Sequence, residues 1–119
     1  MKNIKFAFED LNVYEKALDS VDLAYETTTN FPKHELYGLV SLLNKAAVSI
    51  ALNIAEGSGH TSPQLNRFLQ IAINSVKECV VCSTVASRRK YISAIEDNEI
   101  RQKLEELSKM MGLQKYLKK

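Results

Sequence analysis

Histidine and cysteine side chains are the first candidates for chemistry, because they bind metals and act as acids, bases or nucleophiles. The chain has two of each, at His34, His60, Cys79 and Cys82. A dinuclear metal site in a helical bundle needs Glu-x-x-His, and no glutamate stands three residues before either histidine. The two cysteines fall inside a long helical pattern, away from the helix N-termini and turns where thiolates are stabilised. We therefore expect no metal or cofactor, and we expect both cysteines to be core or interface residues.

Four polar residues form a second candidate group. Ser49, Asn53 and Glu56 recur at spacings of four and three, so they share one face of a helix, and Glu78 is grouped with them. The row has three open interpretations: a hydrogen-bonded corner between two helices, a subunit contact, or a ligand site. Catalysis by Asn53, Glu56 and Glu78 is the least favoured, because no histidine or nucleophile–base pair accompanies them.

Basic residues form the candidate nucleic-acid-binding group. Its members are Lys45, Arg67, Lys77, Arg88, Arg89 and Lys90. Residues 61–90 hold five Lys or Arg and one Glu, whereas residues 1–30 hold three Lys and six Asp or Glu. Arginine binds phosphate through two parallel hydrogen bonds, and the neighbouring Tyr91 is able to stack on an unpaired base. The competing interpretation is that cations near a helix C-terminus merely interact favourably with the helix dipole.

Size and composition indicate one globular domain over residues 1–119. The chain is 45% hydrophobic and 25% charged, with four glycines and two prolines, which favours long regular elements over many turns. The first residues carry charges at Lys2, Lys5, Glu9 and Asp10 and no apolar stretch, so we expect no secretory signal. We find no run of about 20 apolar residues of the kind that spans a membrane. These features predict a cytoplasmic protein.

The elements that must position these residues are four helices. Their predicted ranges are about 10–29, 34–56, 62–91 and 96–117. Ile4, Phe6 and Phe8 alternate before the first helix, which predicts a short extended arm over residues 1–9 that lies against the bundle or against a neighbouring subunit. Four amphipathic segments joined by short connections predict an all-α, up-and-down antiparallel four-helix bundle.

Each predicted helix has an apolar stripe at alternating spacings of three and four. The first contains Leu11, Tyr14, Leu18, Val21 and Tyr25. The second contains Leu36, Val40, Leu43, Ala47, Ile50 and Ile54. The third contains Leu65, Leu69, Ala72, Val76 and Cys79. The fourth contains Ile100, Leu104, Leu107 and Met111. Leu42 and Val81 are surplus apolar residues on otherwise polar or small-residue stripes, which predicts an exposed patch suited to an interface.

Two runs in the second helix resemble the signature of the 23S rRNA intervening-sequence protein family, also called the four-helix bundle protein family. Residues 45–50 read Lys-Ala-Ala-Val-Ser-Ile, and residues 53–57 read Asn-Ile-Ala-Glu-Gly. Further similarity includes Asp10-Leu11, Tyr14, Lys16-Ala17, Phe31-Pro32, residues 35–39, residues 68–72, Ser75 and Glu78. The likeness extends over nearly the whole chain.

The resemblance implies a homo-oligomeric, ring-like bundle protein, expected to be a pentamer, without enzymatic activity. Some genes of this family lie inside intervening sequences of ribosomal RNA genes, and a similar protein is the nucleic-acid-binding accessory subunit of diversity-generating retroelements. Residues 42–45 read Leu-Leu-Asn-Lys where the family often has Gln-x-Arg-Arg. His60 stands where arginine is common, and Asn74 replaces a frequent glycine. These departures predict a lower nucleic-acid affinity, or binding through other residues.

Two functions therefore compete. The first is a non-enzymatic, homo-oligomeric protein associated with RNA. The second is a protein-interaction module that positions a partner enzyme, for example a nucleic-acid enzyme, without binding nucleic acid itself. The expected partners are further copies of the chain and either RNA or such an enzyme.

Overall fold

The structure is a computed structural model that describes the backbone of residues 3–117 and the side chains of residues 3–112. The four main helices are α1 (Asn12–Thr28), α2 (Ser41–Gly57), α3 (Ser62–Arg88) and α4 (Ala94–Leu117). Short helical turns are η1 (Ala7–Asp10), η2 (Lys33–Glu35) and η3 (Leu36–Val40). No strand is present among residues 3–117, which confirms the predicted all-α class.

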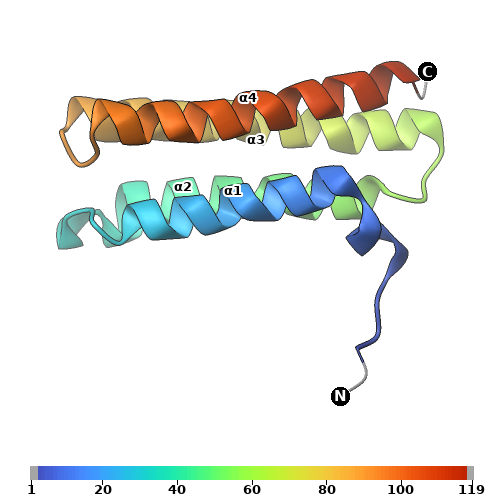
Figure 1. The fold of residues 1–119 in the computed structure, drawn as a ribbon, viewed down its shortest axis with the longest axis horizontal. Helices are drawn as coiled ribbons and strands as arrows, with labels where there is room; N and C mark the ends of the chain where they lie inside the picture. The colour runs from blue at the N-terminus through green and yellow to red at the C-terminus, as the bar shows by residue number, and fades with distance from the viewer. Residues whose placement is uncertain (1–2, 118–119) are drawn as a thin grey trace.

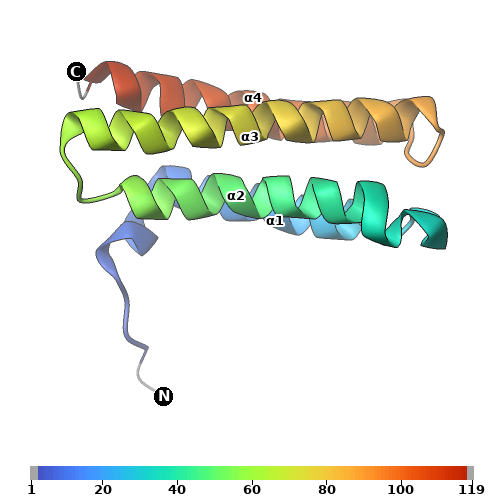
Figure 2. The same ribbon diagram turned by 180° about the vertical axis from the view of Figure 1, so that it is seen from behind.

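The four helices run antiparallel in chain order (Figure 1). Each helix packs against its two neighbours, with α1 against α2 and α4, and α3 against the same two helices. The connections α1–α2 and α3–α4 lie at one end of the bundle, while the α2–α3 connection lies at the other end with both chain ends (Figure 2). The topology therefore brings together two connections that are far apart in the sequence.

The core lies along the axis of the bundle. Its largest fully buried side chains include Leu43, Ile50, Ile54, Leu69, Leu107 and Met111. All predicted stripe residues of the third and fourth helices are buried, as predicted. The third helix ends at Arg88, three residues earlier than predicted, because Lys90 adopts a left-handed backbone conformation with φ 65°.

The predicted buried face of the first helix is confirmed only in part: Leu11, Tyr14 and Val21 are partly buried and pack against the core. Leu18 and Tyr25 are exposed, and the buried residues of α1 include Val13, Ala17 and Ala24. These smaller residues form a second stripe, offset by one position, with the same alternating spacing. Small side chains let neighbouring helices approach closely, and the bulkier Leu18 and Tyr25 are left exposed beside them.

The start of the second predicted helix also differs. Three elements, η2, η3 and α2, replace one continuous helix, and Gly38 has a non-helical backbone with φ −111° and ψ −109°. This break leaves Leu36 and Tyr37 exposed, so Leu36 does not belong to the core. The part of the predicted apolar stripe from Leu43 to Ile54 is buried, as predicted.

The arm is extended only in part, because residues 7–10 form the turn η1. It does not lie against its own bundle: Ile4 is 81% exposed and Phe6 is 64% exposed. Figure 1 shows the arm leaving the α1 end of the bundle and pointing away from the helices. Contact with a neighbouring subunit stays a prediction.

Two stretches, Lys33–Gly57 and Ser62–Arg88, are long and apolar enough to cross a membrane by length and composition. Both supply buried residues to the bundle, such as Ile50 and Leu69. A core helix meets the same criterion, so this finding is weak evidence for a membrane span.

Candidate nucleic-acid interface

Two connections meet at one end of the bundle through Tyr91. The ring of Tyr91 lies 5.4 Å from that of Phe31, measured between centroids, and its hydroxyl donates a hydrogen bond of 3.0 Å to Glu35 Oε2. These contacts place η2, with the exposed residues Lys33 and His34, next to the end of α3. We call the resulting surface the basic end and define it by Lys33, His34, Arg88, Arg89 and Lys90.

The sequence analysis missed Lys33 and His34 as parts of this surface. They lie more than 50 positions before Arg88 in the sequence. The signal was nevertheless present, because an up-and-down bundle places its first and third connections at the same end. The topology thus extends the predicted cluster of three cations.

A helix-ending motif fixes the three cations of α3. The backbone N–H of Tyr91 donates to the Ala86 carbonyl at 2.9 Å, and that of Lys90 donates to the Ser87 carbonyl at 3.0 Å. This is the Schellman pattern, in which the left-handed position is usually glycine. Lysine occupies it here at φ 65°, a conformation that costs a non-glycine residue about 1 kcal/mol.

The cations of α3 are open to a ligand. Arg88, Arg89 and Lys90 are all exposed, and none of them forms an ion pair with another residue that the structure describes. Arg88 and Arg89 line a hollow of about 300 Å³ together with Val85. Guanidinium groups in this setting are suited to phosphate oxygens, which they bind through charge-assisted hydrogen bonds.

Glu35 lies at this end together with Glu96 and Asp97 in the first turn of α4, and its carboxylate is already engaged. Oε1 accepts a hydrogen bond of 3.1 Å from the backbone N–H of Leu39, while Oε2 accepts the bond from Tyr91. These two hydrogen bonds, the one from Leu39 first, lower the pKa of Glu35. Burial, followed by the neighbouring Glu35, raises the pKa of Tyr91. The pair therefore joins the connections as an ionised acceptor and a neutral donor.

The other predicted cations, Lys45, Arg67 and Lys77, lie along α2 and α3 and not at the helix end formed by Arg88, Arg89 and Lys90. Arg67 lies near the start of α3 and Arg88 is its last residue, so about 31 Å separates them along the helix. All three side chains are exposed on α2 and α3. The structure therefore divides the predicted binding group into two separate sets.

Glutamates accompany this second set. Ser49 of α2 and Ser75 of α3 are joined by a hydrogen bond of 2.9 Å between their hydroxyl oxygens, which fixes the register of the two antiparallel helices. In that register Lys45 lies level with Glu78, and Arg67 lies level with Glu56. Charges of both signs therefore alternate along α2 and α3 at the level of this second set.

The predicted polar row is also divided. Asn53 donates from Nδ2 to the Ser49 carbonyl at 2.8 Å and to Ser49 Oγ at 3.1 Å, and Ser75 donates to the same Oγ. Asn53 and Ser75 are buried, so this network satisfies polar groups between α2 and α3. Glu56 and Glu78 are exposed and lie outside it. The sequence analysis did not include Ser75 in the row.

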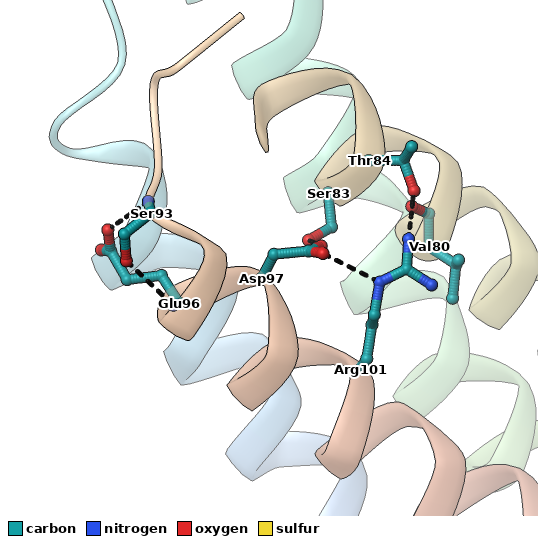
Figure 3. A network of polar contacts seen from close by, with 7 residues as sticks. All are labelled: Val80, Ser83, Thr84, Ser93, Glu96, Asp97 and Arg101. Carbon is teal, nitrogen blue, oxygen red and sulfur yellow. Dashed lines mark hydrogen bonds and ion pairs between the residues drawn. The ribbon is translucent and has the colours of Figure 1, made fainter. Parts of the chain in front are cut away.

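A further network supports the α3–α4 connection (Figure 3). Ser83 is buried and donates to Asp97 Oδ1 at 2.5 Å, while Arg101 bridges Asp97 Oδ2 at 3.0 Å and the hydroxyl of Thr84. Ser93 caps α4 through reciprocal hydrogen bonds with Glu96, a capping box. These contacts hold the connection that carries Arg89 and Lys90 at the end of the bundle.

The cysteines lie in the core. Both are buried free thiols, and burial raises the pKa of Cys79 to about 12. Burial also raises the pKa of Cys82, so both side chains are neutral thiols. Among the residues that the structure describes, no group of three or more His, Cys, Asp or Glu side chains is arranged to hold a metal ion.

The fold and the basic end together define a helical bundle protein with a cationic surface made by two connections. The sequence profile of the 23S rRNA-intervening sequence protein family matches residues 9–112. The chain belongs to this family, which confirms the resemblance found in the sequence. Comparison with curated proteins gave no significant match.

Proposed function

We propose that this protein is a non-enzymatic, cytoplasmic, self-associating bundle that binds RNA through its basic end. Family membership supports the association with RNA, and the oligomer is expected to be a pentamer on the same ground. The basic end supports the location of the binding surface, because its cations are exposed and Arg88, Arg89 and Lys90 form no ion pair with a residue that the structure describes. Tyr91 and His34 add aromatic rings beside these cations, and such rings stack on unpaired bases.

The conformation of Lys90 is the single observation that carries this assignment of the surface. Glycine at this position would remove the cost of the left-handed backbone. A lysine here keeps a positive charge at the tip of the connection at the expense of stability. Strain of this kind concentrates where a side chain is needed for function.

The test compares two triple variants in a fluorescence anisotropy titration with labelled single-stranded RNA. Arg88→Gln, Arg89→Gln and Lys90→Gln together should weaken binding at least tenfold and should flatten the dependence on salt. In a plot of the logarithm of the binding constant against the logarithm of the salt concentration, the slope should change by about 2. Each phosphate contact on a single strand contributes about −0.7 to this slope, and the variant loses three cations.

The matched control removes the same charge from the other set, with Lys45→Gln, Arg67→Gln and Lys77→Gln. The affinity of this control for RNA should stay within about threefold of the affinity of the unaltered protein. The reason is that salt largely screens charges that lie away from the bound RNA. If the control variant loses the affinity and the basic-end variant retains it, the binding surface lies on α2 and α3 instead.

A second candidate function has its own support. Leu42 and Val81 are 52% and 61% exposed, in agreement with the predicted exposed patch. An apolar patch of this kind fits a partner protein, for example a nucleic-acid enzyme. Leu42→Ser with Val81→Ser would abolish co-purification of such a partner and leave RNA affinity unchanged if the protein is an interaction module.

A further inference from the structure

The arm carries apolar side chains that its own bundle leaves uncovered. The ring of Phe8 packs edge-on against Tyr14 at 5.1 Å, and the ring of Phe6 stacks on Phe8 at 6.3 Å. Beyond this stack, Ile4 and most of Phe6 face solvent. The aromatic stack thus continues the outer stripe of α1 past the end of the helix and into the arm.

The root of the arm is held in place. The backbone N–H of Phe6 donates to Glu9 Oε1 at 2.8 Å, and the N–H of Glu9 donates to the Phe6 carbonyl at 3.0 Å. These reciprocal bonds close a hydrogen-bonded turn at the start of η1. The direction in which Ile4 leaves the bundle is therefore set by a defined local structure.

A groove with uncovered apolar walls lies on the outer side of α1 and α2. Its apolar lining, which defines the outer groove, is Tyr25, Leu36, Val40, Val48 and Leu52. Its polar lining is Ser41, Asn44, Lys45 and Ser49. The groove has a volume of about 520 Å³, and four of its five apolar residues are exposed. A surface of this composition is suited to an apolar peptide segment.

The arm cannot fill the groove of its own chain. Tyr25 lies almost four turns along α1 from its first residue, which is about 20 Å at 1.5 Å per residue. Ile4 lies two residues beyond the fixed Phe6, which is about 7 Å of extended chain. Only the arm of another molecule can bring Ile4 and Phe6 to Tyr25 and Leu36.

Charge favours the same pairing. Asp22 and Glu26 flank Tyr25 on the exposed side of α1, and neither forms an ion pair with a residue that the structure describes. The arm contributes Lys5. Lys5 is paired with Asp10 at 3.1 Å, but both side chains are highly exposed, so this pair is easily exchanged for another.

We propose that the arm of one molecule occupies the outer groove of a second copy of this chain. Ile4 and Phe6 contact the apolar walls, and Lys5 meets the acidic residues Asp22 and Glu26 of α1. This inference rests on the self-association proposed above and specifies the contact through which it occurs. It also explains why apolar residues are exposed both on the arm and in the outer groove of a single chain.

Cross-linking between two differently tagged chains tests the proposal. One chain carries Ile4→Cys and the other Leu52→Cys, and the native cysteines stay silent because they are buried. Mild oxidation of the mixture should give an inter-chain disulfide between positions 4 and 52. The control pairs Ile4→Cys with Val81→Cys, an equally accessible position on α3, and should give at least tenfold less product.

Native mass spectrometry of the same mixtures separates the possible failures. An oligomer with equal cross-linking at positions 52 and 81 would overturn the arm contact and leave self-association intact. A monomer at all concentrations would overturn both proposals. Phe6→Ser should weaken self-association at least tenfold, whereas Ile95→Ser, which removes an even more exposed apolar residue from α4, should not. Equal dissociation constants for these two variants would contradict the arm contact.

Discussion

The hydroxyl of Tyr91 donates a hydrogen bond of 3.0 Å to Glu35 Oε2, and this bond links the two connections at the basic end. The two residues lie 56 positions apart in the sequence. Their contact fixes η2 against the end of α3 and thereby sets the distance between two groups of cations. The geometry of the candidate binding surface therefore depends on a neutral donor and an ionised acceptor.

Removal of the tyrosine hydroxyl should loosen this link. Tyr91→Phe keeps the ring beside Phe31 and deletes the hydrogen bond, so it should lower the free energy of unfolding by about 1 kcal/mol. Urea denaturation followed by circular dichroism measures the change. Tyr37→Phe is the control, because that side chain is almost fully exposed and the substitution should have no effect. Equal stability of all three proteins would show that the link contributes nothing.

Glu35 should make part of the stability depend on pH. Its pKa is lower in the folded protein than its usual value of 4.5, so the unfolded state binds the proton more readily. The contribution of the carboxylate is therefore present above pH 4.5 and is lost as the pH falls through the lower folded value. The difference in unfolding free energy between the unaltered protein and Glu35→Gln should be largest at pH 7 and should shrink in acid. A difference that is constant with pH would contradict this assignment.

Lys90→Gly should have opposite effects on stability and binding. Glycine adopts φ 65° without the penalty of a side chain, so unfolding should require about 1 kcal/mol more. Loss of the charge should weaken RNA binding by a few-fold. Lys90→Ala is the matched control, since it also removes the charge but keeps the backbone penalty. If glycine and alanine variants have the same stability, the lysine backbone is not strained.

Two glycine substitutions should change stability in opposite directions. A Cβ at Gly57 would lie 2.9 Å from Phe68 Cβ and 3.2 Å from Leu65 Cδ1, so Gly57→Ala should destabilise the bundle by about 1–3 kcal/mol. A Cβ at Gly112 meets nothing within 4 Å, and Gly112→Ala should stabilise α4 by up to about 1 kcal/mol. Thermal unfolding of both variants tests the close approach of α2 to α3. If Gly57→Ala leaves the thermal stability unchanged, α2 does not approach α3 this closely.

Periodicity predicted the core well where one apolar stripe dominated. In α3 all the residues of the predicted stripe, from Leu65 to Cys79, are buried. In α1 two stripes with the same spacing compete, and the smaller one, with Ala17 and Ala24, faces the core. Spacing alone does not distinguish the two, because the choice depends on how closely α2 and α4 approach.

The candidate site was predictable only in part. The run from Arg88 to Lys90 is visible in the sequence, whereas Lys33 and His34 join it only through the bundle topology. The left-handed backbone of Lys90 was not predictable, since lysine rarely adopts it. Exposure of the arm also depended on tertiary structure, because alternation of Ile4 and Phe6 says nothing about which surface covers them.

Native mass spectrometry of the protein purified from its own host at low salt tests the central proposal most directly. The account predicts an oligomer that carries RNA, and it predicts that the RNA dissociates at high salt because counterions replace it on the basic end. The subunit count would test the expected pentamer, and the released RNA is available for sequencing. A bare monomer, or an oligomer that carries another protein and no RNA at low salt, would contradict the proposal.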